Sequence, residues 1–440
     1  MAGPSAKRAP GRNLLWQTLH TLSFAIIGQV TQVVAGVVYA RILGPAGKGI
    51  LSYAVTIVVL SMTIADGIRQ AIAYEIGTEH ENQRRVFGTA LEALTLIAFA
   101  GVFVWLGLMR IGPHPEVYPV VGVAFTTSLF LNGFIGLYLV HNLVERTNAV
   151  YLAATILMSL GGAVGVWLFK MSPLGIVAVM AFANLLAAGF LLRGAIVLAG
   201  GAPIFRSPGL LGRHLRFAGT VALASTITYL ALRVDVFLVS ARLPAASLGL
   251  YTLALGSGEL MWQLGRAAGT AAFGRIATLP REESIALTAR LTRSVILVQS
   301  VVAIALFVVG PWLITRVYGS AFTESGAVMR IALPGLVVYS ATSILAQFFS
   351  LKEGRPRIAV AVELFSLTLC VVVTMITVGR FGIAGAAAAK TLAYFTSFAV
   401  ASAIFVRRTG VSVFDVLIPR REDLDGLVQL VRARLPSRGL

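Results

Sequence analysis

Apolar segments of membrane-spanning length alternate with short polar breaks along almost the whole chain. A helix that crosses the hydrocarbon core of a bilayer needs about 20 mostly apolar residues. The sequence predicts such helices at 14–40, 50–73, 87–109, 118–141, 149–169 and 174–198, and again at 215–241, 248–273, 291–317, 327–350, 357–379 and 383–406. No connecting segment is long enough for a folded soluble domain. The predicted fold class is therefore all-α, a polytopic membrane protein with twelve transmembrane helices.

Composition supports this interpretation and excludes other classes. Hydrophobic residues make up 57% of the 440 residues, and charged residues only 12%, about half of their usual share of ~25%. A soluble protein could not bury so much apolar surface, so lipid must be the solvent for most of the chain. Secreted, disordered and nucleic-acid-binding proteins are excluded as descriptions of the whole chain, although a net charge of +18 would by itself suggest nucleic acid.

The basic residues are distributed unevenly between the two ends of the predicted helices. With the N-terminus inside, 24 Lys and Arg lie on the cytoplasmic side, 8 on the opposite side and 4 within the helices. Cytoplasmic loops collect Lys and Arg, so both termini are predicted to be cytoplasmic, with the loops 41–48 and 242–247 outside. The first apolar stretch, 14–40, is too long for a signal peptide and is predicted to be retained as a membrane helix.

An internal repeat relates the two halves of the chain. Residues 40–54 have a partner at 241–254, and both segments join a first helix to a second through Ala-Arg, a proline and a glycine before an apolar residue. Six helices followed by six imply parallel repeats, related by an axis along the membrane normal and facing a central cavity. We expect an N-terminal lobe at 1–198, a cytoplasmic linker at 199–214, a C-terminal lobe at 215–406 and a basic cytoplasmic tail at 407–440.

The tail contains aliphatic residues at spacings of three and four. Leu424, Leu427, Val428, Val431 and Leu435 would share one face of a helix. Such a helix is expected to lie on the inner leaflet. The alternative is a frayed end without a role, because termini tolerate change.

Three short motifs carry a resemblance to a known family. They are Ala40-Arg41-Ile42-Leu43-Gly44-Pro45 with Gly49, Ala65-Asp66-Gly67-Ile68-Arg69, and Arg233-Val234-Asp235 before Gly249-Leu250-Tyr251. With the helix count and the repeat, they resemble the Wzx-type oligosaccharide flippases of the MOP exporter superfamily, which also contains lipid II flippases and MATE drug exporters. The resemblance implies a flippase for polyprenyl-pyrophosphate-linked oligosaccharides in a bacterial or archaeal plasma membrane, working by alternating access.

Polar side chains recur at helical spacing on two of the predicted helices. A charge at the bilayer centre costs about 2.5–3.5 kcal/mol on insertion scales, so each one needs an explanation. The stripes contain Thr63, Asp66 and Gln70 on 50–73, and Glu259, Gln263 and Arg266 on 248–273. We expect both stripes to line a wet cavity. Asp66 and Glu259 are the predicted ion-coupling residues, because a carboxyl in a partly dry cavity can change its charge as the lobes move.

The predicted substrate-binding residues are basic or carry amides: they are Arg266, Arg233, Arg69, Lys390, Gln32 and Gln263. Arginine suits a pyrophosphate head group because its fork makes paired, charge-assisted hydrogen bonds. Asp235 lies two residues beyond Arg233, about 200° around the helix, and is expected to brace a neighbouring helix instead.

Structural roles remain open for several of these charges. Asp66 and Arg69 are three residues apart and could neutralise each other as a pair, and Arg69 could also extend to the interface. In that case Glu259 is the residue left to respond to ions. Glu259 and Arg266 could instead find partners within the bundle, and Lys390 could anchor a helix.

The sequence is less consistent with two other function classes. A MATE-like drug or cation antiporter would need a more acidic cavity than this basic one. A polytopic polyprenyl-dependent glycosyltransferase or polymerase would need acidic residues on a sizeable outer loop, and the sequence carries no catalytic or metal-binding motif of that kind. We therefore expect a transporter without catalytic residues, metal or cofactor. Its expected partners are the lipid-linked glycan and membrane lipids, with coupling to protons or sodium and contacts with other polysaccharide-assembly proteins as further options.

Overall fold

The computed structural model describes residues 10–205, 208–262 and 274–418 of the chain. Over these residues the protein is helical and has no β-strand, which confirms the predicted all-α class. The chain divides into two compact units, Met1–Thr226 (unit 1) and Ile227–Leu440 (unit 2). The predicted tail helix over 424–435 lies outside the described residues.

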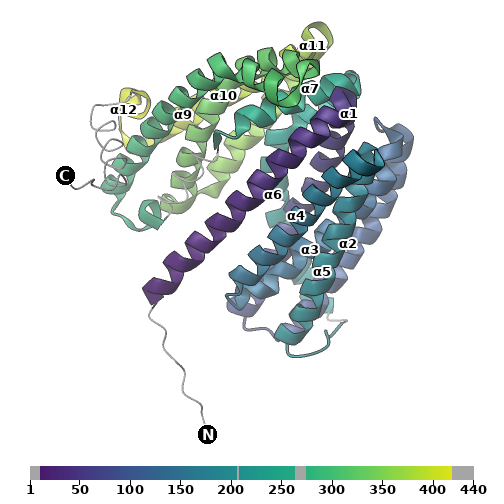
Figure 1. The fold of residues 1–440 in the computed structure, drawn as a ribbon. Helices are drawn as coiled ribbons and strands as arrows, with labels where there is room; N and C mark the ends of the chain where they lie inside the picture. Colours follow the sequence, from purple (N-terminus) through teal and green to yellow (C-terminus); the bar gives the residue numbers. More distant parts are fainter. Residues whose placement is uncertain (1–9, 206–207, 263–273, 419–440) are drawn as a thin grey trace, which may run out of the picture. The chain divides into compact units, whose positions relative to one another are not determined.

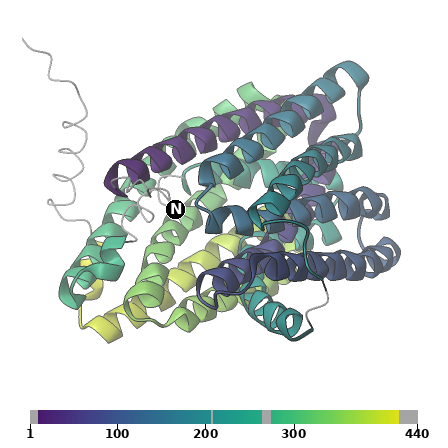
Figure 2. The same cartoon turned by 90° about the horizontal axis from the view of Figure 1, so that it is seen from below.

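Unit 1 is built around a central helix with apolar neighbours. Its elements are α1 (Pro10–Gly77), α2 (Gln83–Ile111), η1 (Pro115–Val117), α3 (Tyr118–Val140), α4 (Val144–Phe169), α5 (Pro173–Leu198) and the first part of α6 (Pro208–Arg242). The α3 helix packs against α1, α2, α4 and α5, and Figures 1 and 2 show α2 to α5 running alongside one another. Its residues Leu129 and Leu137 are fully buried in the core. The α6 helix begins at Pro208, within the stretch 199–214 where a linker was expected.

Unit 2 has a similar central helix, α10. Its elements are the end of α6, α7 (Ala245–Glu259), α9 (Arg281–Tyr318), η2 (Ser320–Phe322), α10 (Thr323–Gln347), the π-helical turn η3 (Phe348–Lys352), α11 (Pro356–Thr409) and α12 (Val413–Leu417). The α10 helix packs against α7, α9 and α11, and Figure 1 shows it alongside α9. Phe348, Phe349 and Phe405 close the core where η3 meets α11.

Nine helical spans in the described part of the chain are long and apolar enough to cross a membrane. The protein is therefore a multi-pass membrane protein. Two of the spans, Ser23–Gly77 and Pro356–Thr409, are 55 and 54 residues long, more than twice what one crossing needs. A further predicted span, 248–273, is described only in part, because 263–273 lie outside the described residues.

The predicted breaks at 41–48 and before residue 383 are present but shorter than expected. At each place two helical stretches meet at a single glycine with non-helical backbone angles, Gly44 (φ 65°, ψ −176°) and Gly382 (φ 56°, ψ −139°). Glycine adopts a left-handed φ without steric cost, so one residue is enough to redirect the chain. Pro45 then starts the next helical stretch, where its missing N–H costs no hydrogen bond.

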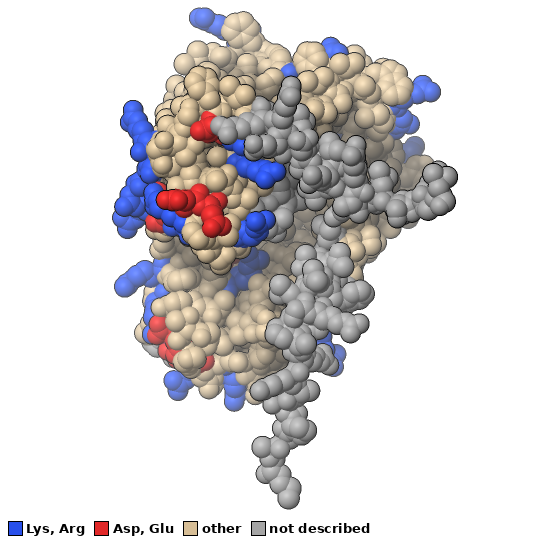
Figure 3. Space-filling model, turned by 90° about the vertical axis from the view of Figure 1, so that its left-hand side faces the viewer, with Lys and Arg blue, Asp and Glu red and all other residues tan. Residues whose placement is uncertain are grey.

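Large apolar side chains point outward from both units. On α2, Phe99 and Phe103 are each 63% exposed. Only 11% of the most apolar 18-residue stretch of this helix is buried inside the protein. On the face drawn in Figure 3, residues other than Lys, Arg, Asp and Glu cover the surface between groups of charged side chains. Surfaces of this kind are stable only against lipid.

Candidate functional site

Four charged side chains of unit 2 form one connected network. Arg233 of α6 donates from Nη1 to Glu259 Oε1 at 3.0 Å and from Nη2 to Oε2 at 2.6 Å. Lys390 of α11 lies 2.9 Å from Asp235 Oδ2 of α6 and 3.9 Å from Glu259 Oε1 at the end of α7. The network therefore ties three helices together, and its Arg233–Glu259 link has the paired geometry of a strong charge-assisted contact.

Lys390 and Asp235 lie at the buried centre of this network. Each is only 1% exposed. The Lys390 ammonium also donates to the carbonyl oxygen of Leu232 at 2.7 Å, and the Tyr251 hydroxyl of α7 donates to Asp235. A buried charge is tolerated only when partners surround it. Asp235 thus contacts side chains of α7 and α11, which confirms the prediction that it braces neighbouring helices.

Arg233 is the accessible member of the network. Its side chain is 31% exposed, whereas those of Glu259, Lys390 and Asp235 are 9%, 2% and 1% exposed. A guanidinium carries five donors, and Glu259 takes two of its nitrogens. Arg233 therefore combines a fixed position with a face that a ligand can reach.

An aromatic cluster adjoins the network, and sequence reasoning missed it. Tyr339 of α10 packs on Tyr394 of α11 with ring centroids 4.4 Å apart, and on Trp262 at 5.0 Å. The Tyr339 hydroxyl donates to Glu363 Oε1 at 3.4 Å, and Lys390 Nζ lies 5.8 Å from the Tyr394 ring. The sequence did contain a sign of this cluster: Tyr339 and Tyr394 occur in apolar helices, where a hydroxyl group usually needs a hydrogen-bond partner.

The charged pair of unit 1 lies on one helix. Arg69 and Asp66, three residues apart on α1, form an ion pair in which their side chains remain 35% and 25% exposed. Asp66 also accepts from Gln70 at 3.4 Å and from Ser225 of α6 at 3.3 Å. The pairing expected from the spacing is confirmed, and both groups stay partly accessible.

Gly67, which lies between Asp66 and Arg69 on α1, has a steric role. A Cβ at Gly67 would collide with the carbonyl oxygen of Ala218, so α1 and the first part of α6 approach with backbones almost touching. One turn earlier, the hydroxyls of Thr63 and Thr226 lie 2.9 Å apart. The sequence Asp66-Gly67 therefore supplies both a polar contact and a close approach to α6.

A buried pair of unit 1 joins the end of α1 to the beginning of α6. His214 Nδ1 of α6 lies 2.9 Å from Glu75 Oε2 of α1, with side chains 0% and 2% exposed. Arg213 and Glu81 form a further ion pair beside it. These contacts were not predicted, because the histidines are scattered in the sequence and only the fold brings His214 to Glu75.

Gln32 lies at a different place in unit 1. With Gly28 and Gln29 of α1 it lines a cavity of about 260 Å³, closed on the α4 side by Asn148 and Tyr151 among others. The Tyr151 hydroxyl donates to Asn132 of α3. The wall of this cavity offers amide and hydroxyl groups, which suit hydrogen bonding to sugars.

The predicted site residues thus fall into separate groups. Arg233, Glu259 and Lys390 meet in unit 2, and Asp66 and Arg69 meet in unit 1. Gln263 and Arg266 lie outside the described residues. Within the described ranges, no three His, Cys, Asp or Glu side chains are grouped to hold a metal ion. The single cysteine, Cys370, is buried, with its sulfur 3.9 Å from the Thr374 hydroxyl.

Solved transporters share this fold. The chain is similar to the lipid II flippase MurJ in an inward closed conformation, with a TM-score of 0.73 and 12% identity over 97% of this chain and 94% of that one. It is similar to an inward-facing multidrug resistance MATE family transporter (TM-score 0.68, 14% identity, 89% and 98% covered). It is also similar to a MOP superfamily transporter from Pyrococcus furiosus Vc1, whose binding pocket is reported to have reverse polarity. The TM-score is 0.62, with 13% identity over 89% of this chain and 94% of that one.

The sequence comparisons place the chain in a family. No curated protein matches it. The pattern of the family described as "Polysaccharide biosynthesis protein" matches residues 12–272, more than half of the chain. Together with the fold, this match confirms the resemblance to the flippases of the MOP superfamily that the sequence motifs carry. The chain belongs to the polysaccharide biosynthesis protein family of membrane proteins.

Proposed function

We propose that this protein flips polyprenyl-pyrophosphate-linked oligosaccharides, the repeat units of a polysaccharide or O-antigen, across the plasma membrane by alternating access. The observation that carries the proposal is the match to the polysaccharide biosynthesis family over residues 12–272. The fold shared with transporters favours transport over catalysis. Arg233 and Arg69 support an anionic head group, because each keeps about a third of its side chain exposed.

The Arg233–Glu259 pair suggests how binding and coupling would be linked. A pyrophosphate offers the same paired oxygens as a carboxylate, so it would compete with Glu259 for the guanidinium. A proton or sodium ion on Glu259 would weaken its hold on Arg233 and favour the substrate. In unit 1, Asp66 and Arg69 would act in the same way, with the head group competing with Asp66 for the Arg69 guanidinium. Lys390, by contrast, is proposed to anchor α6 to α11, because its ammonium is buried among Asp235, Leu232 and Glu259.

The direct test is transport by variants of Arg233 in proteoliposomes containing a polyprenyl-pyrophosphate-linked oligosaccharide. Arg233→Ala is expected to reduce flipping at least tenfold, the effect of about 1.4 kcal/mol, and Arg233→Lys to restore part of it. The matched control is Arg242→Ala, an exposed arginine at the end of the same helix. Full transport by Arg233→Ala would exclude it from substrate binding. Arg266, proposed from the sequence as a second ligand of the pyrophosphate, is tested in the same assay.

We further propose twelve membrane crossings with both termini in the cytoplasm. The 55- and 54-residue spans would each cross twice, bending at Gly44 and Gly382, and the partly described span starting with α7 would complete the count. Single cysteines at Ala46 and Ala246 are expected to react with an impermeant thiol reagent in intact cells. Protection of both positions would contradict this topology, and with it the proposed lobes at 1–198 and 215–406.

A MATE-like antiporter for cationic drugs is the second candidate, supported by the shared fold. Such a transporter needs carboxylates that are free to bind cations. Asp66, Asp235 and Glu259 are instead held by Arg69, Lys390 and Arg233, which favours the flippase. Efflux of a cationic dye that depends on Glu259, without glycolipid flipping, would reverse this preference.

A further inference from the structure

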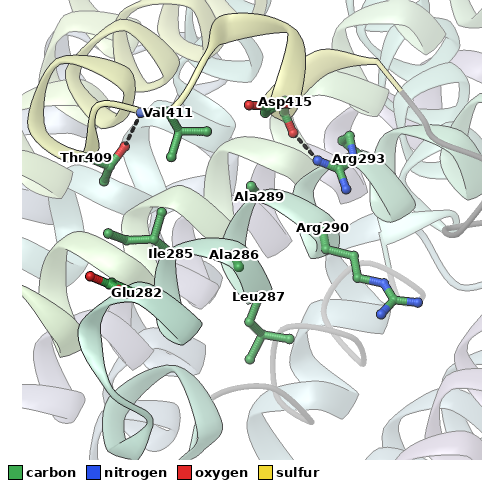
Figure 4. A pocket seen from close by; sticks show the side chains of 10 residues that line it. All are labelled: Glu282, Ile285, Ala286, Leu287, Ala289, Arg290, Arg293, Thr409, Val411 and Asp415. Atoms are coloured by element: carbon green, nitrogen blue, oxygen red, sulfur yellow. Dashed lines mark hydrogen bonds between the residues drawn. The ribbon is translucent and has the colours of Figure 1, made fainter.

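Two cavities in the described part of the chain differ in their chemistry. The larger one, of about 610 Å³, lies at the start of α9 in unit 2 and is drawn in Figure 4. Three charged residues of its wall, Arg290, Arg293 and Asp415, already interact within the protein. The smaller one, of about 260 Å³, lies between α1 and α4 and includes Gln32; we call it the unit 1 cavity. Among the described residues, no Lys, Arg, Asp or Glu lines it, so it suits a neutral ligand.

Three polar side chains of the unit 1 cavity make no hydrogen bond among the described residues. They are Gln29 and Gln32 of α1 and Thr155 of α4. Each of these amide and hydroxyl groups can both donate and accept, as the hydroxyls of a sugar also do. A polar group without a partner is unfavourable in apolar surroundings. A ligand with hydroxyl groups would therefore be stabilised at this place.

Gly28 supplies the space between these side chains. It is buried, and a Cβ at this position would lie 3.7 Å from Leu152 Cδ1 and 3.8 Å from Thr155 Cγ2. Both are ordinary contact distances, so a methyl group would occupy part of the cavity without displacing α4. The volume of about 260 Å³ is just below the ~300–1,000 Å³ of sites for drug-sized ligands. It suits a single sugar ring.

Tyr151 connects this cavity to the Asp66–Arg69 pair. Its side chain lines the cavity, and its hydroxyl donates to Asn132 of α3. One turn further along α3, Gly136 packs against the backbone of Arg69, where a Cβ would lie 3.0 Å from the carbonyl oxygen. Tyr151 is also close enough to Asp66 and Arg69 to interact electrostatically with both. The cavity therefore lies beside an arginine that is proposed to bind the head group.

We propose that the unit 1 cavity binds one sugar ring of the lipid-linked oligosaccharide. The amides of Gln29 and Gln32 and the hydroxyl of Thr155 bind the hydroxyls of the ring, while Arg69 holds the pyrophosphate beside it. This inference rests on the proposed function and deepens it, because it assigns the recognition of the sugar to neutral groups and that of the pyrophosphate to a charged one.

Native mass spectrometry of the full-length protein, in a detergent without sugar head groups, tests the proposal. The probes are a polyprenyl-pyrophosphate that carries galactose, glucose or N-acetylglucosamine, and the same lipid without a sugar. We expect at least one sugar-linked lipid to be retained about tenfold more strongly than the bare lipid, as two or three hydrogen bonds between neutral groups would give. Equal retention of all four lipids would overturn the sugar site and leave the proposed function intact. Retention of none of them would overturn both.

Two variants test the residues of the cavity. Gln29→Met with Gln32→Met removes both amides at similar side-chain length, and it is expected to lose the roughly tenfold preference for the sugar-linked lipid. Its retention of the bare lipid should stay unchanged. Gly28→Ala is expected to lower the same preference several-fold, because its methyl group would occupy the cavity. An equal fall in the retention of both kinds of lipid would overturn the proposal.

Thr31→Val and Gly36→Ala are the matched controls on the same helix. The Thr31 hydroxyl donates to the carbonyl oxygen of Ile27 outside the cavity, and a Cβ at Gly36 would meet no neighbour. An unchanged preference in both controls, together with its loss in the cavity variants, supports the site. An equal loss in either control would overturn it. So would equally strong retention of a diacylglycerol-linked glucose, which would indicate a site for ordinary membrane glycolipids.

Discussion

In unit 2, Arg233, Asp235, Glu259 and Lys390 come from three helices and neutralise one another across the contacts between them. In unit 1, Asp66 and Arg69 neutralise each other within one turn of α1. The first arrangement makes the packing of α6, α7 and α11 depend on charge. The Asp66–Arg69 pair joins no two helices, and beside it α1 and α6 meet through close approach and hydroxyl groups, whereas the buried Glu75–His214 pair lies nearer their ends. Charged residues therefore connect three helices in unit 2, where Arg233 is the accessible one, whereas both members of the Asp66–Arg69 pair in unit 1 stay partly exposed.

The largest effect is expected from breaking the unit 2 network. Lys390→Ala would leave Asp235 buried without a cation, and loss of one partner of a buried pair costs about 3–5 kcal/mol. The free energy of unfolding of the purified protein in detergent measures this loss. The double variant Asp235→Asn with Lys390→Met removes both charges and is expected to recover most of the stability. A Lys390→Ala protein as stable as the wild type would show that the network does not cross-link the helices.

A smaller effect is expected where unit 1 relies on close approach. Gly67→Ala would force α1 away from the carbonyl oxygen of Ala218, and overpacking of this kind costs about 1–3 kcal/mol. Gly36→Ala on the same helix is the control, because a Cβ there would meet no neighbour. Both variants are compared by thermal unfolding in detergent. Equal midpoints would refute the close contact between α1 and α6.

The smallest effect is expected for the unit 1 ion pair. Partly exposed pairs contribute about 0–1 kcal/mol, so Asp66→Asn should change the free energy of unfolding by less than 1 kcal/mol. Exchanging the two charges, Asp66→Arg with Arg69→Asp, should preserve the fold as well. Glycolipid flipping by the same variants sharpens the comparison, since the pair is proposed to act in transport. A loss of stability as large as that of Lys390→Ala would remove the difference between the units.

Patterns that depend on neighbours along the chain were predictable from the sequence. The ends of α3 and α5 lie within a residue or two of the predicted spans, because the apolar runs are bounded by polar or turn-forming residues. The Asp66–Arg69 pair follows from helical geometry alone. So does the fact that Asp235 and Arg233 leave their helix in different directions. The break at 41–48 was predicted to be longer than it is, because one glycine with a left-handed φ is enough to separate two helical stretches.

Contacts between distant segments could not be predicted in the same way. The pairing of Arg233 with Glu259 and of Glu75 with His214 depends on which helices become neighbours. Periodicity shows that a residue shares a face with others, but not which helix that face meets. The sequence therefore predicts Arg233 as a ligand of the substrate, and the structure shows that its guanidinium is paired with the Glu259 carboxylate.

The kinks at Gly44 and Gly382 have a consequence for proteolysis. A protease needs an extended, exposed segment that fits its active-site cleft, and surface loops usually provide one. At these two places the chain changes direction at a single residue between helical stretches, so neither offers such a segment. We expect digestion of intact cells to leave both positions uncut even if they face the protease.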